Sequence, residues 1–495
     1  MPLAVLESGM EDMNALGLLI GEQDMPASDG RTFERRNPIT GEIATLVAAA
    51  TIDDARQACD AAARAFPDWA ATSPKQRRKL RGGAADALEA RVEDFVRSMA
   101  TEIGATAGWA RFNVMLAADM LREAAAMTTQ IGGEIIPSNR PGSLAMAVRQ
   151  PAGVVLSMAP WNAPVILGVR SLAMPLACGN TVVMKTSEIC PGTHRLIVDA
   201  LHEGGVPRGV LNAVSNAPDD APELVEAMIA HPAVRRVNFT GSTRVGRIIA
   251  EMGGRHLKPC LLELGGKAPF VVLDDADLEQ AVEAAAFGAF MNQGQICMST
   301  ERIVVDDAVA ETFVEKLAAK ARSLKAGDPR VGDTPLGAVV GEGAARRIQD
   351  LIRDAVAKGA VLVAGGSAQG SVMQPTVLDR VTPAMSIYGE ESFGPVVTIV
   401  RADGIDDAVR IANDTEYGLS SAVFGRDVTR AMAVARRIES GICHINGPTV
   451  HDEAQMPFGG VKASGYGRFG GKAGIAEFTE LRWITIQDGP VHYPF

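Results

Sequence analysis

Apolar positions are spaced as in amphipathic helices through the first part of the chain. A Thr-x-x-Asp box at Thr51 predicts a helix over residues 53–66, and further apolar stripes predict helices over residues 74–102 and 110–130. Residues 1–25 show no pattern that predicts an element. Helices are thus the only elements that the pattern predicts before residue 131.

From Pro151 onward the pattern changes to short apolar runs separated by helical ones. Strands are predicted at residues 153–158, 181–185, 210–214, 235–240 and 259–264, and helices between them at residues 164–176, 191–203, 221–230 and 245–252. This regular order predicts a doubly wound parallel sheet, in which ligands bind at the carboxyl ends of the strands.

A second alternating series runs from Ala268 to about Ile445. It includes predicted strands at residues 270–273 and 396–400 and a helix over residues 278–291. The series predicts a second α/β domain, because strands and helices again follow each other in turn.

Two separated segments predict a projecting β arm. Residues 132–150 contain Pro137 and Pro141 and alternate in hydrophobicity over residues 144–148, which predicts a hairpin. The tail, residues 478–486, returns to strand character and can complete this arm in the same subunit or in a neighbour. Together the patterns predict an α/β fold with two doubly wound parallel-sheet domains and a small β arm.

Composition is that of an ordinary globular protein. Of the 495 residues, 47% are hydrophobic and 22% are charged, and a chain of this length needs two or three cores. The formal net charge of -11 argues against a nucleic-acid surface. The longest uncharged run, residues 151–169, contains Pro160 and Pro164, so it predicts two buried elements joined by a turn and no membrane span.

The six cysteines are scattered without the spacing of a metal site or a disulfide framework. No metal is therefore expected, and a reduced, cytoplasmic compartment is favoured. The first positive side chain is Arg31, so no secretory or mitochondrial presequence is expected.

One cysteine is distinguished by its position after a polar, glycine-containing bend. Cys297 follows Gly294 and Gln295, with an apolar helical run at residues 281–291 before the bend and a strand-like run at residues 302–305 after it. Such a position presents a thiol, although free cysteine is more often a small buried hydrophobe.

A carboxylate lies in apolar surroundings upstream of this bend. Glu263 stands between Leu262 and Leu264 and is followed by two glycines. The carboxylate is either paired with a cation or kept partly desolvated with a raised pKa, which suits a general base.

These two stretches carry a resemblance to a known family. The sequence Glu-Leu-Gly-Gly-Lys, starting at Glu263, and Gly-Gln-Ile-Cys, ending 34 positions later at Cys297, resemble the aldehyde dehydrogenase superfamily. The resemblance implies Cys297 as nucleophile and Glu263 as general base. It also implies that Asn162 and the Cys297 N–H bind the oxyanion, although Asn162 alone predicts only a turn residue.

The resemblance implies a nicotinamide cofactor, even though the usual Gly-x-Gly-x-x-Gly is absent after the first strand. Residues 239–246 replace it with a strand end, a glycine turn and a helix start, which favours an anion. By resemblance, Gly241 and Ser242 hold the pyrophosphate. By the pattern alone, Ser242 is simply the N-cap of a helix.

Further cofactor residues follow from the same resemblance. Lys185 and Glu188 are expected on the adenine ribose, with a surface ion pair as the alternative. Because Glu188 repels a 2′-phosphate, NAD is expected rather than NADP. Glu391 is expected on the nicotinamide ribose and Phe393 near the nicotinamide, and Trp161 is expected to be a further cofactor-binding residue.

One branch of the superfamily is more similar than the rest. Residues 238–246, 295–302 and 444–447 resemble bacterial salicylaldehyde and vanillin dehydrogenases, which implies an aromatic or cyclic aldehyde as substrate. The candidate walls of the substrate pocket are Trp109, Arg170, Ile296 and Met298. Arg170 is expected either to meet a ring hydroxyl or to form an ordinary ion pair.

Two residues depart from the family pattern. Phe469 stands after Gly-Tyr-Gly-Arg, where much of the superfamily has a glutamate, so deacylation is expected to depend more heavily on Glu263. Ser299 replaces a commoner small residue near Cys297.

The resemblance also implies how the chain is divided and assembled. The expected NAD-binding domain covers residues 18–130 and 151–265, the catalytic domain covers residues 266–474, and the oligomerisation arm covers residues 131–150 and 475–495. A homodimer or homotetramer is expected, with an aldehyde as the small-molecule partner and neither nucleic acid nor membrane.

Four other functions are weighed against this one. A broad-specificity aliphatic or semialdehyde dehydrogenase would share the same motifs. A CoA-acylating enzyme generally lacks a glutamate equivalent to Glu263, and an inactive paralogue would not need Cys297, Glu263 and Asn162 together. A cysteine hydrolase would not need Lys185 and Glu188.

Overall fold

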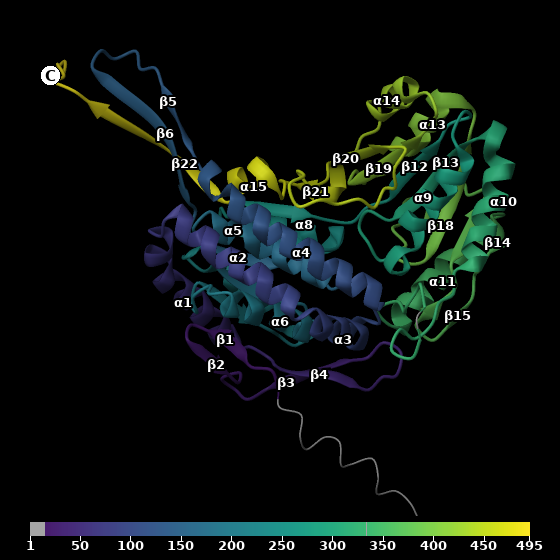
Figure 1. Ribbon diagram of the computed structural model, residues 1–495, viewed down its shortest axis with the longest axis horizontal. Helices are drawn as coiled ribbons and strands as arrows, with labels where there is room; N and C mark the ends of the chain where they lie inside the picture. The colour runs from purple at the N-terminus through teal and green to yellow at the C-terminus, as the bar shows by residue number, and fades with distance from the viewer. Residues whose placement is uncertain (1–14, 333) are drawn as a thin grey trace, which may run out of the picture.

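The computed structural model describes residues 15–332 and 334–495, so the first part of residues 1–25 lies outside the described residues. Figure 1 shows two lobes and a β arm that projects from one of them. Each lobe contains a largely parallel sheet between two layers of helices. The predicted α/β class with two doubly wound domains is therefore confirmed.

The first sheet is built around five parallel strands. In spatial order they are β9 (Leu211–Val214), β8 (Thr181–Lys185), β7 (Val154–Met158), β10 (Val234–Thr240) and β11 (Cys260–Glu263). The first of these in the chain is β7, and later strands are added on both sides of it, so the strand order reverses between β7 and β10. Doubly wound sheets bind ligands at this reversal, beyond the carboxyl ends of the strands.

Helices cover both faces of the first sheet (Figure 1). One face carries α1 (Ile52–Ala70), α7 (Ala221–Ala230) and α8 (Thr243–Arg255), and the other carries α2 (Pro74–Ala90), α4 (Ala107–Met127), α5 (Pro164–Ala177) and α6 (Pro191–Glu203). Alternate residues of β7 belong to different cores, since Val154 and Leu156 pack on the first face and Val155 packs on the second. Burial on both faces explains why the parallel strands are apolar throughout.

The prediction of one helix over residues 74–102 is wrong, because the chain forms two helices there. The first, α2, ends at Ala90, and α3 follows at Val92–Ile103, with Arg91 at φ −101° and ψ 16° between them. Arg91 forms an ion pair with Glu203 of α6, and α2 and α3 both pack on α4 and α6. A straight helix would carry its second half away from these neighbours.

Four strands near the N-terminus are not predicted by the sequence pattern. They are β1 (Leu18–Ile20), β2 (Gln23–Met25), β3 (Thr32–Arg36) and β4 (Ile43–Ala48). The β1 strand adds to the first sheet beside β9, and β3 pairs with β4 in a separate hairpin. The first two strands are only three residues long, and β3 carries three charged residues in a row, so neither shows a clear alternation. At the other edge of the first sheet, β21 (Gly465–Tyr466) lies beside β11 and is only two residues long.

The second sheet has six parallel strands and one antiparallel edge strand. In spatial order they are β14 (Val361–Ala364), β17 (Thr376–Asp379), β18 (Val396–Ala402), β13 (Thr300–Asp306), β12 (Ala268–Val272), β19 (Ser420–Phe424) and β20 (Ile442–Ile445). One face is covered by α9 (Leu278–Phe290) and α10 (Asp307–Ser323), and the other by α11 (Glu342–Ala357), α13 (Gly404–Asn413) and α14 (Val428–Ala435). Shorter elements in this region are β15 (Ala368–Gln369), β16 (Val372–Met373) and α12 (Ser386–Gly389).

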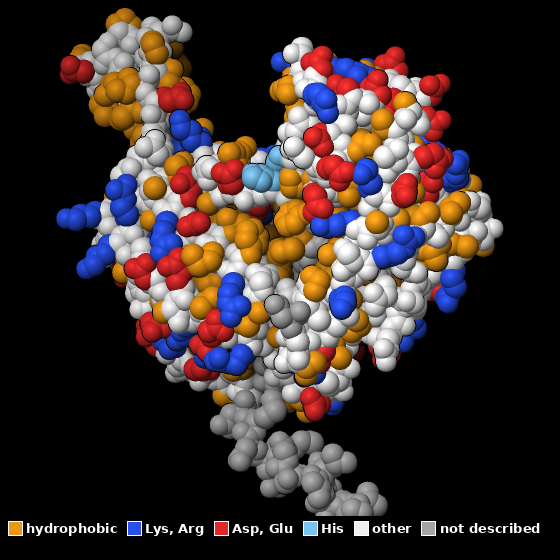
Figure 2. Space-filling view, turned by 45° about the vertical axis from the view of Figure 1, so that its right-hand side comes forward, with side chains coloured by type: hydrophobic (Ala, Val, Ile, Leu, Met, Phe, Trp, Pro, Cys, Tyr) orange, Lys and Arg blue, Asp and Glu red, His pale blue; other side chains and the backbone are white. Residues whose placement is uncertain are grey.

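The arm is a three-stranded antiparallel sheet of β5 (Gly133–Ile136), β6 (Ser143–Pro151) and β22 (Thr479–Gln487). The last strand, β22, follows α15 (Gly471–Glu477) and pairs with β6 along its whole length, so the tail completes the arm of its own subunit. Apolar side chains remain exposed on the arm, including Ile135 at 76% and Trp483 at 79%. Figure 2 shows hydrophobic side chains gathered there.

The uncharged run at residues 151–169 forms β7 and the start of α5, joined by a turn, as predicted. None of the helices in residues 15–332 and 334–495 combines the length and the apolar composition that a bilayer span requires.

Candidate active site

A cavity of about 1080 Å³ lies between the two sheets. Its walls include the residues that follow β7, β8 and β10 of the first sheet and those that precede β13 and β18 of the second. The carboxyl ends of the strands in the first sheet therefore face the amino ends of the strands in the second sheet.

The structure brings ten of the sequence-predicted site residues to this cavity. Its lining includes Asn162, Glu263 and Cys297 together with Trp161, Lys185, Glu188, Gly241, Ser242, Glu391 and Phe393. These residues come from six separate segments of the chain. Their convergence is a property of the fold that no single motif contains.

A left-handed bend places Cys297 at the cavity. After α9 ends, Asn292, Gln293 and Gly294 have φ values of 49°, 56° and 67°. A Cβ at Gly294 would lie 2.1 Å from the carbonyl oxygen of Gly394, so only glycine fits there. The side chain of Gln293 fixes the bend, since it accepts from Gly337 N–H at 2.8 Å and donates to the carbonyl of Ala338 at 2.9 Å.

Glu263 ends β11 inside the protein. Its side chain is buried, and neither carboxylate oxygen accepts a hydrogen bond of ordinary geometry from the described residues. Burial raises its pKa to about 8, against a smaller opposite effect of the Arg170 charge. Among residues 15–332 and 334–495, no cation forms a direct ion pair with this carboxyl group, so the ion-pair alternative is not observed there.

Cys297 is half-buried beside Glu263. Burial raises the pKa of the thiol well above its usual range, and the negative charge of Glu263 raises it further. The other five cysteines are also free, but they do not line this cavity. The structure therefore favours the interpretation of Cys297 as a presented thiol.

Asn162 is a buried side chain at the turn between β7 and α5. Its side-chain Nδ2 donates to the backbone carbonyl of Gln295 at 2.8 Å. The backbone carbonyl of Asn162 accepts from Trp109 Nε1 at 3.0 Å and from Asn292 Nδ2 at 2.8 Å. These bonds fix Asn162 against the bend that carries Cys297. An amide nitrogen has two hydrogens, and the contact with Gln295 uses one of them.

The turn between β10 and α8 forms another part of the wall. Ser242 is the N-cap of α8 and accepts from Val245 N–H at 3.4 Å, as the plain structural alternative predicted. Gly241 lies against the ring of Phe239, where a Cβ would approach to 2.4 Å. The start of α8 therefore opens into the cavity with its dipole directed there.

Lys185 and Glu188 form an ion pair beside the end of β8. Glu188 also accepts from Asn216 Nδ2 at 3.1 Å. Both side chains are largely buried and line the cavity, so the pair is more enclosed than the ordinary surface pair that was the alternative.

Glu391 and Phe393 precede β18. Glu391 accepts from Gly266 N–H at 2.9 Å, and burial raises its pKa to about 7. Phe393 has a φ of 49°, and its ring meets the Trp161 ring edge-on with centroids 5.7 Å apart. The segment after Glu263 and the loop before β18 are thus in direct contact.

The four candidate substrate-pocket residues do not line the large cavity. Trp109, Ile296 and Met298 are buried in the adjoining core. Arg170 forms a buried ion pair with Asp452, its guanidinium lies 4.1 Å from the Phe458 ring centroid, and its Nη1 has no hydrogen-bond partner in the described chain. The ion-pair alternative is therefore the one observed for Arg170.

Sequence reasoning missed several residues of the site. Asp452 gave no signal, because its partner Arg170 is 282 positions away. Tyr417 and Arg347 line the cavity but belong to no motif. Lys267 stands in the Glu-Leu-Gly-Gly-Lys motif, where a fully buried lysine could have been noticed as a residue that needs a partner.

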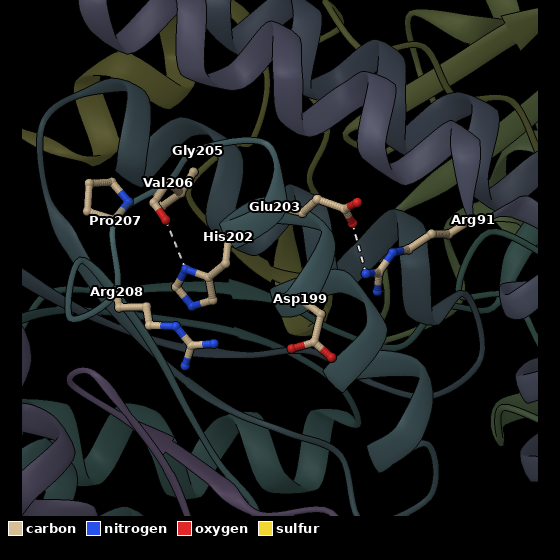
Figure 3. Close-up of a pocket in the computed structure, with 8 residues that line it drawn as sticks. All are labelled: Arg91, Asp199, His202, Glu203, Gly205, Val206, Pro207 and Arg208. Atoms are coloured by element: carbon tan, nitrogen blue, oxygen red, sulfur yellow. Dashed lines mark hydrogen bonds and ion pairs between the residues drawn. The ribbon is translucent and has the colours of Figure 1, made fainter.

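A second hollow, of about 570 Å³, lies at the end of α6 (Figure 3). Arg91 pairs with Glu203 at 2.8 Å, and His202 Nδ1 lies 2.9 Å from the carbonyl of Val206. None of the predicted site residues lines this hollow. Across the described ranges there is no group of three or more histidine, cysteine or acidic side chains placed to hold a metal ion.

Comparisons with known proteins agree with this arrangement. Residues 25–484 match the model of the aldehyde dehydrogenase family. Vanillin dehydrogenase of Pseudomonas sp. strain HR199 is 64% identical, over 96% of this chain and 99% of that protein. The chain is also similar to a crystal structure of salicylaldehyde dehydrogenase from Pseudomonas putida G7 complexed with salicylaldehyde, with 51% identity, a TM-score of 0.95 and coverage of 97% and 99%.

A more distant structure carries a cofactor. The crystal structure of betaine aldehyde dehydrogenase from Staphylococcus aureus in complex with NAD+ is 31% identical, with a TM-score of 0.93 and coverage of 97% of each chain. The family match spans most of the chain, and it agrees with the two-sheet fold and with the motifs around Glu263 and Cys297. The chain therefore belongs to the aldehyde dehydrogenase family.

Proposed function

We propose that this protein oxidises aromatic aldehydes to carboxylic acids with NAD, through a thioester on Cys297. The observation that carries the proposal is the placement of Glu263 at the wall of a cavity, buried beside a half-buried thiol and without a hydrogen bond of ordinary geometry from the described part of the chain. Such a carboxyl group has a proton affinity suited to a general base near neutral pH.

In the first step the sulfur of Cys297 attacks the aldehyde carbonyl carbon. The thiol proton passes to the carboxylate of Glu263, which is the neighbouring base, and a carbon–sulfur bond forms as the carbonyl π bond breaks. The negative charge on oxygen is stabilised by Asn162 Nδ2 and the Cys297 N–H. The hydrogen bonds that hold Asn162 against the bend keep its amide oriented before the reaction begins.

Oxidation of the resulting thiohemiacetal needs a hydride acceptor, which the bound nicotinamide ring supplies. The cavity residues fit such a cofactor. The start of α8 suits a pyrophosphate, and the carboxylates of Glu188 and Glu391 can accept hydrogen bonds from ribose hydroxyls. Apolar side chains of Pro222, Val225 and Ile249 line the same cavity and suit an adenine ring.

The thioester is then hydrolysed. Glu263 first releases the thiol proton to solvent, so that it is again a carboxylate. It then takes a proton from a water molecule, the hydroxide attacks the thioester carbon, and the carbon–sulfur bond breaks to return the Cys297 thiolate. Phe469 cannot assist as a base, and its side chain is buried. Glu263 therefore carries the hydrolytic step in this proposal.

NAD is proposed in preference to NADP. Glu188 is largely buried, so its negative charge is only weakly screened where the adenine ribose would lie. A 2′-phosphate at that position would meet like charge. The betaine aldehyde dehydrogenase that was solved with NAD+ is consistent with this choice.

The aromatic substrate is proposed from the vanillin and salicylaldehyde dehydrogenase relatives. The test is NADH formation at 340 nm with vanillin, salicylaldehyde, benzaldehyde and hexanal, for the wild-type protein and Cys297→Ala. Turnover on the ring aldehydes that the substitution abolishes is the expected result. Activity on hexanal alone would support the aliphatic alternative, and activity retained in Cys297→Ala would contradict the mechanism.

Hydrolysis is proposed over transfer to CoA because Glu263 is present. Adding CoA to the assay separates the two, since an acylating enzyme would release the acyl-CoA and would depend on CoA for steady turnover. An inactive paralogue would form no NADH with any aldehyde of the panel.

The arm is proposed to join subunits in a homodimer or homotetramer. It exposes Trp483 and Ile135, and isolated monomers rarely expose large apolar groups together. We retain the domain ranges 18–130 with 151–265, 266–474, and 131–150 with 475–495 as part of this proposal. A cytoplasmic location is proposed because all six cysteines are free.

A further inference from the structure

A buried ion pair joins the segments that carry the two catalytic side chains. Lys267 Nζ donates to Glu301 Oε2 at 2.7 Å, and the side chains are 0% and 4% exposed. Lys267 lies four residues after Glu263, and Glu301 lies four residues after Cys297. The pair therefore fixes the chain beyond the proposed base to the chain beyond the proposed nucleophile.

The same pair holds the loop of residues 390–393 that precedes β18. Glu301 Oε1 accepts from the N–H of Ser392 at 3.0 Å, from the hydroxyl of Ser392 at 2.8 Å and from the N–H of Phe393 at 2.9 Å. Lys267 Nζ donates to the carbonyl of Glu390 at 2.8 Å. The loop is thus fixed by charged side chains at several successive residues.

The conformation of Phe393 depends on this support. Its φ of 49° lies in the left-handed region, which bulky residues adopt only where the surroundings impose it. The bond from its N–H to Glu301 is one such constraint, and the edge-on contact with Trp161 is another. The neighbouring carboxylate of Glu391 is held in turn by Gly266 N–H.

We propose that Glu301, paired with Lys267, is a positioning residue for hydride transfer. It fixes residues 390–393, and with them Glu391, relative to Cys297. Neither Lys267 nor Glu301 is among the side chains that line the cavity, so they act through the loop. The inference rests on the proposed function, because it takes Cys297 as nucleophile and Glu391 as a cofactor residue.

Two reactions of the same thiol separate positioning from general support. An activated ester, p-nitrophenyl acetate, acylates Cys297 with release of p-nitrophenol, and water then hydrolyses the thioester without any hydride transfer. Oxidation of benzaldehyde with NAD requires the hydride step in addition. Deuterium at the formyl carbon shows how far this step limits the rate.

The informative variants are Glu301→Gln and the double variant Lys267→Met with Glu301→Gln, which leaves no unpaired charge in the core. A misplacement of reacting groups by about 1 Å costs roughly 100-fold, so kcat for benzaldehyde is expected to fall roughly 10- to 100-fold. The KM for benzaldehyde and the rate of ester hydrolysis are expected to stay within about twofold, since both are independent of loop 390–393. The deuterium isotope effect on NADH formation is expected to increase.

Two further variants complete the comparison. Ser392→Ala removes only the hydroxyl donor to Glu301, so a smaller loss in the same direction is expected, and it serves if Glu301→Gln does not fold. Glu279→Gln is the matched control, because it breaks an exposed ion pair with Lys316 on the same domain. The control is expected to match the wild type in both reactions.

The outcomes are distinguishable. Parallel loss of ester hydrolysis and NADH formation would overturn the inference, because the pair would then support the whole site rather than the hydride step. Unchanged NADH formation in both Glu301 variants would also overturn it. Absence of NADH formation in the wild type, with every aldehyde tested, would contradict the proposed function and the inference together.

Discussion

The buried carboxyl group of Glu263 lies beside the half-buried thiol of Cys297, where the carboxyl ends of one sheet face the amino ends of the other. Burial raises the pKa of the thiol, and the Glu263 charge raises it further. The two groups repel each other when both are ionised, so ionisation of one disfavours ionisation of the other.

Glu263→Gln is expected to lower the pKa of Cys297, because the substitution removes a negative charge while burial is retained. The measurement is the pH dependence of Cys297 alkylation by iodoacetamide, followed by mass spectrometry. The midpoint is expected at lower pH than in the wild type. Glu279→Gln, in an exposed pair, is the control and is expected to leave the midpoint unchanged; an identical midpoint in Glu263→Gln would contradict the electrostatic account.

Ester hydrolysis is expected to depend on pH with a midpoint near 8. The general base acts as a carboxylate, and burial raises the pKa of Glu263 to about 8, so the active form appears as the pH rises through that value. The rate of thioester hydrolysis should therefore increase from pH 6 to pH 10 in the wild type and lose this dependence in Glu263→Gln. A midpoint near the ordinary glutamate pKa of 4.5 would contradict a desolvated base.

Removing one partner of the buried ion pair between Arg170 and Asp452 is expected to destabilise the protein, whereas replacing both partners with apolar residues is not. Arg170→Met leaves a buried carboxylate without its partner and should lower the free energy of unfolding by about 3–5 kcal/mol. The double change Arg170→Met with Asp452→Leu should restore most of that loss. Chemical denaturation measures both, with Arg122→Met, in an exposed pair with Glu89, expected to cost less than about 1 kcal/mol.

The same double variant tests the role of Arg170 towards substrate. Its Nη1 is buried without a partner in the described chain, so a ring hydroxyl would supply the missing acceptor. Loss of that bond is expected to lower kcat/KM for salicylaldehyde relative to benzaldehyde by roughly tenfold. Equal effects on the two aldehydes would assign the pair a structural role only.

Glu188→Ala is expected to relax the choice of cofactor. Removing a largely buried carboxylate removes like-charge repulsion against a 2′-phosphate, and such repulsion is worth enough to change the NADP to NAD preference by roughly tenfold or more. The ratio of kcat/KM values for the two cofactors measures this. A ratio that stays at the wild-type value would show that Glu188 does not contact the ribose.

Regular elements of the fold were predictable because local pattern and tertiary burial agree. The strand at residues 181–185 and the helix at residues 191–203 are observed with the predicted bounds. The prediction of one helix over residues 74–102 failed, because the interruption at Arg91 depends on packing against α6. A local sequence pattern does not contain that contact. The hairpin of β3 and β4 was not predicted because β3 carries three charged residues in a row and shows no regular apolar alternation.

The sequence motifs predicted residues that the fold brings to one cavity, but they did not predict the residues that hold them in place. Cys297, Glu263 and the cofactor residues stand in recognisable motifs, and all of them line one cavity. Their supports are contacts between distant segments, such as Asp452 with Arg170 and Glu301 with Ser392. Charged residues at such positions resemble ordinary surface residues until the fold shows that they are buried.

The pairing of β22 with β6 also determines when the arm can exist. It joins residues 479–487 to residues 143–151, so the strand at its edge is made only after nearly the whole chain has left the ribosome. Both sheets can form earlier, because their strands are complete before residue 479, but the full surface proposed for assembly cannot. The proposed association of subunits through the arm would therefore follow the synthesis of its last strand.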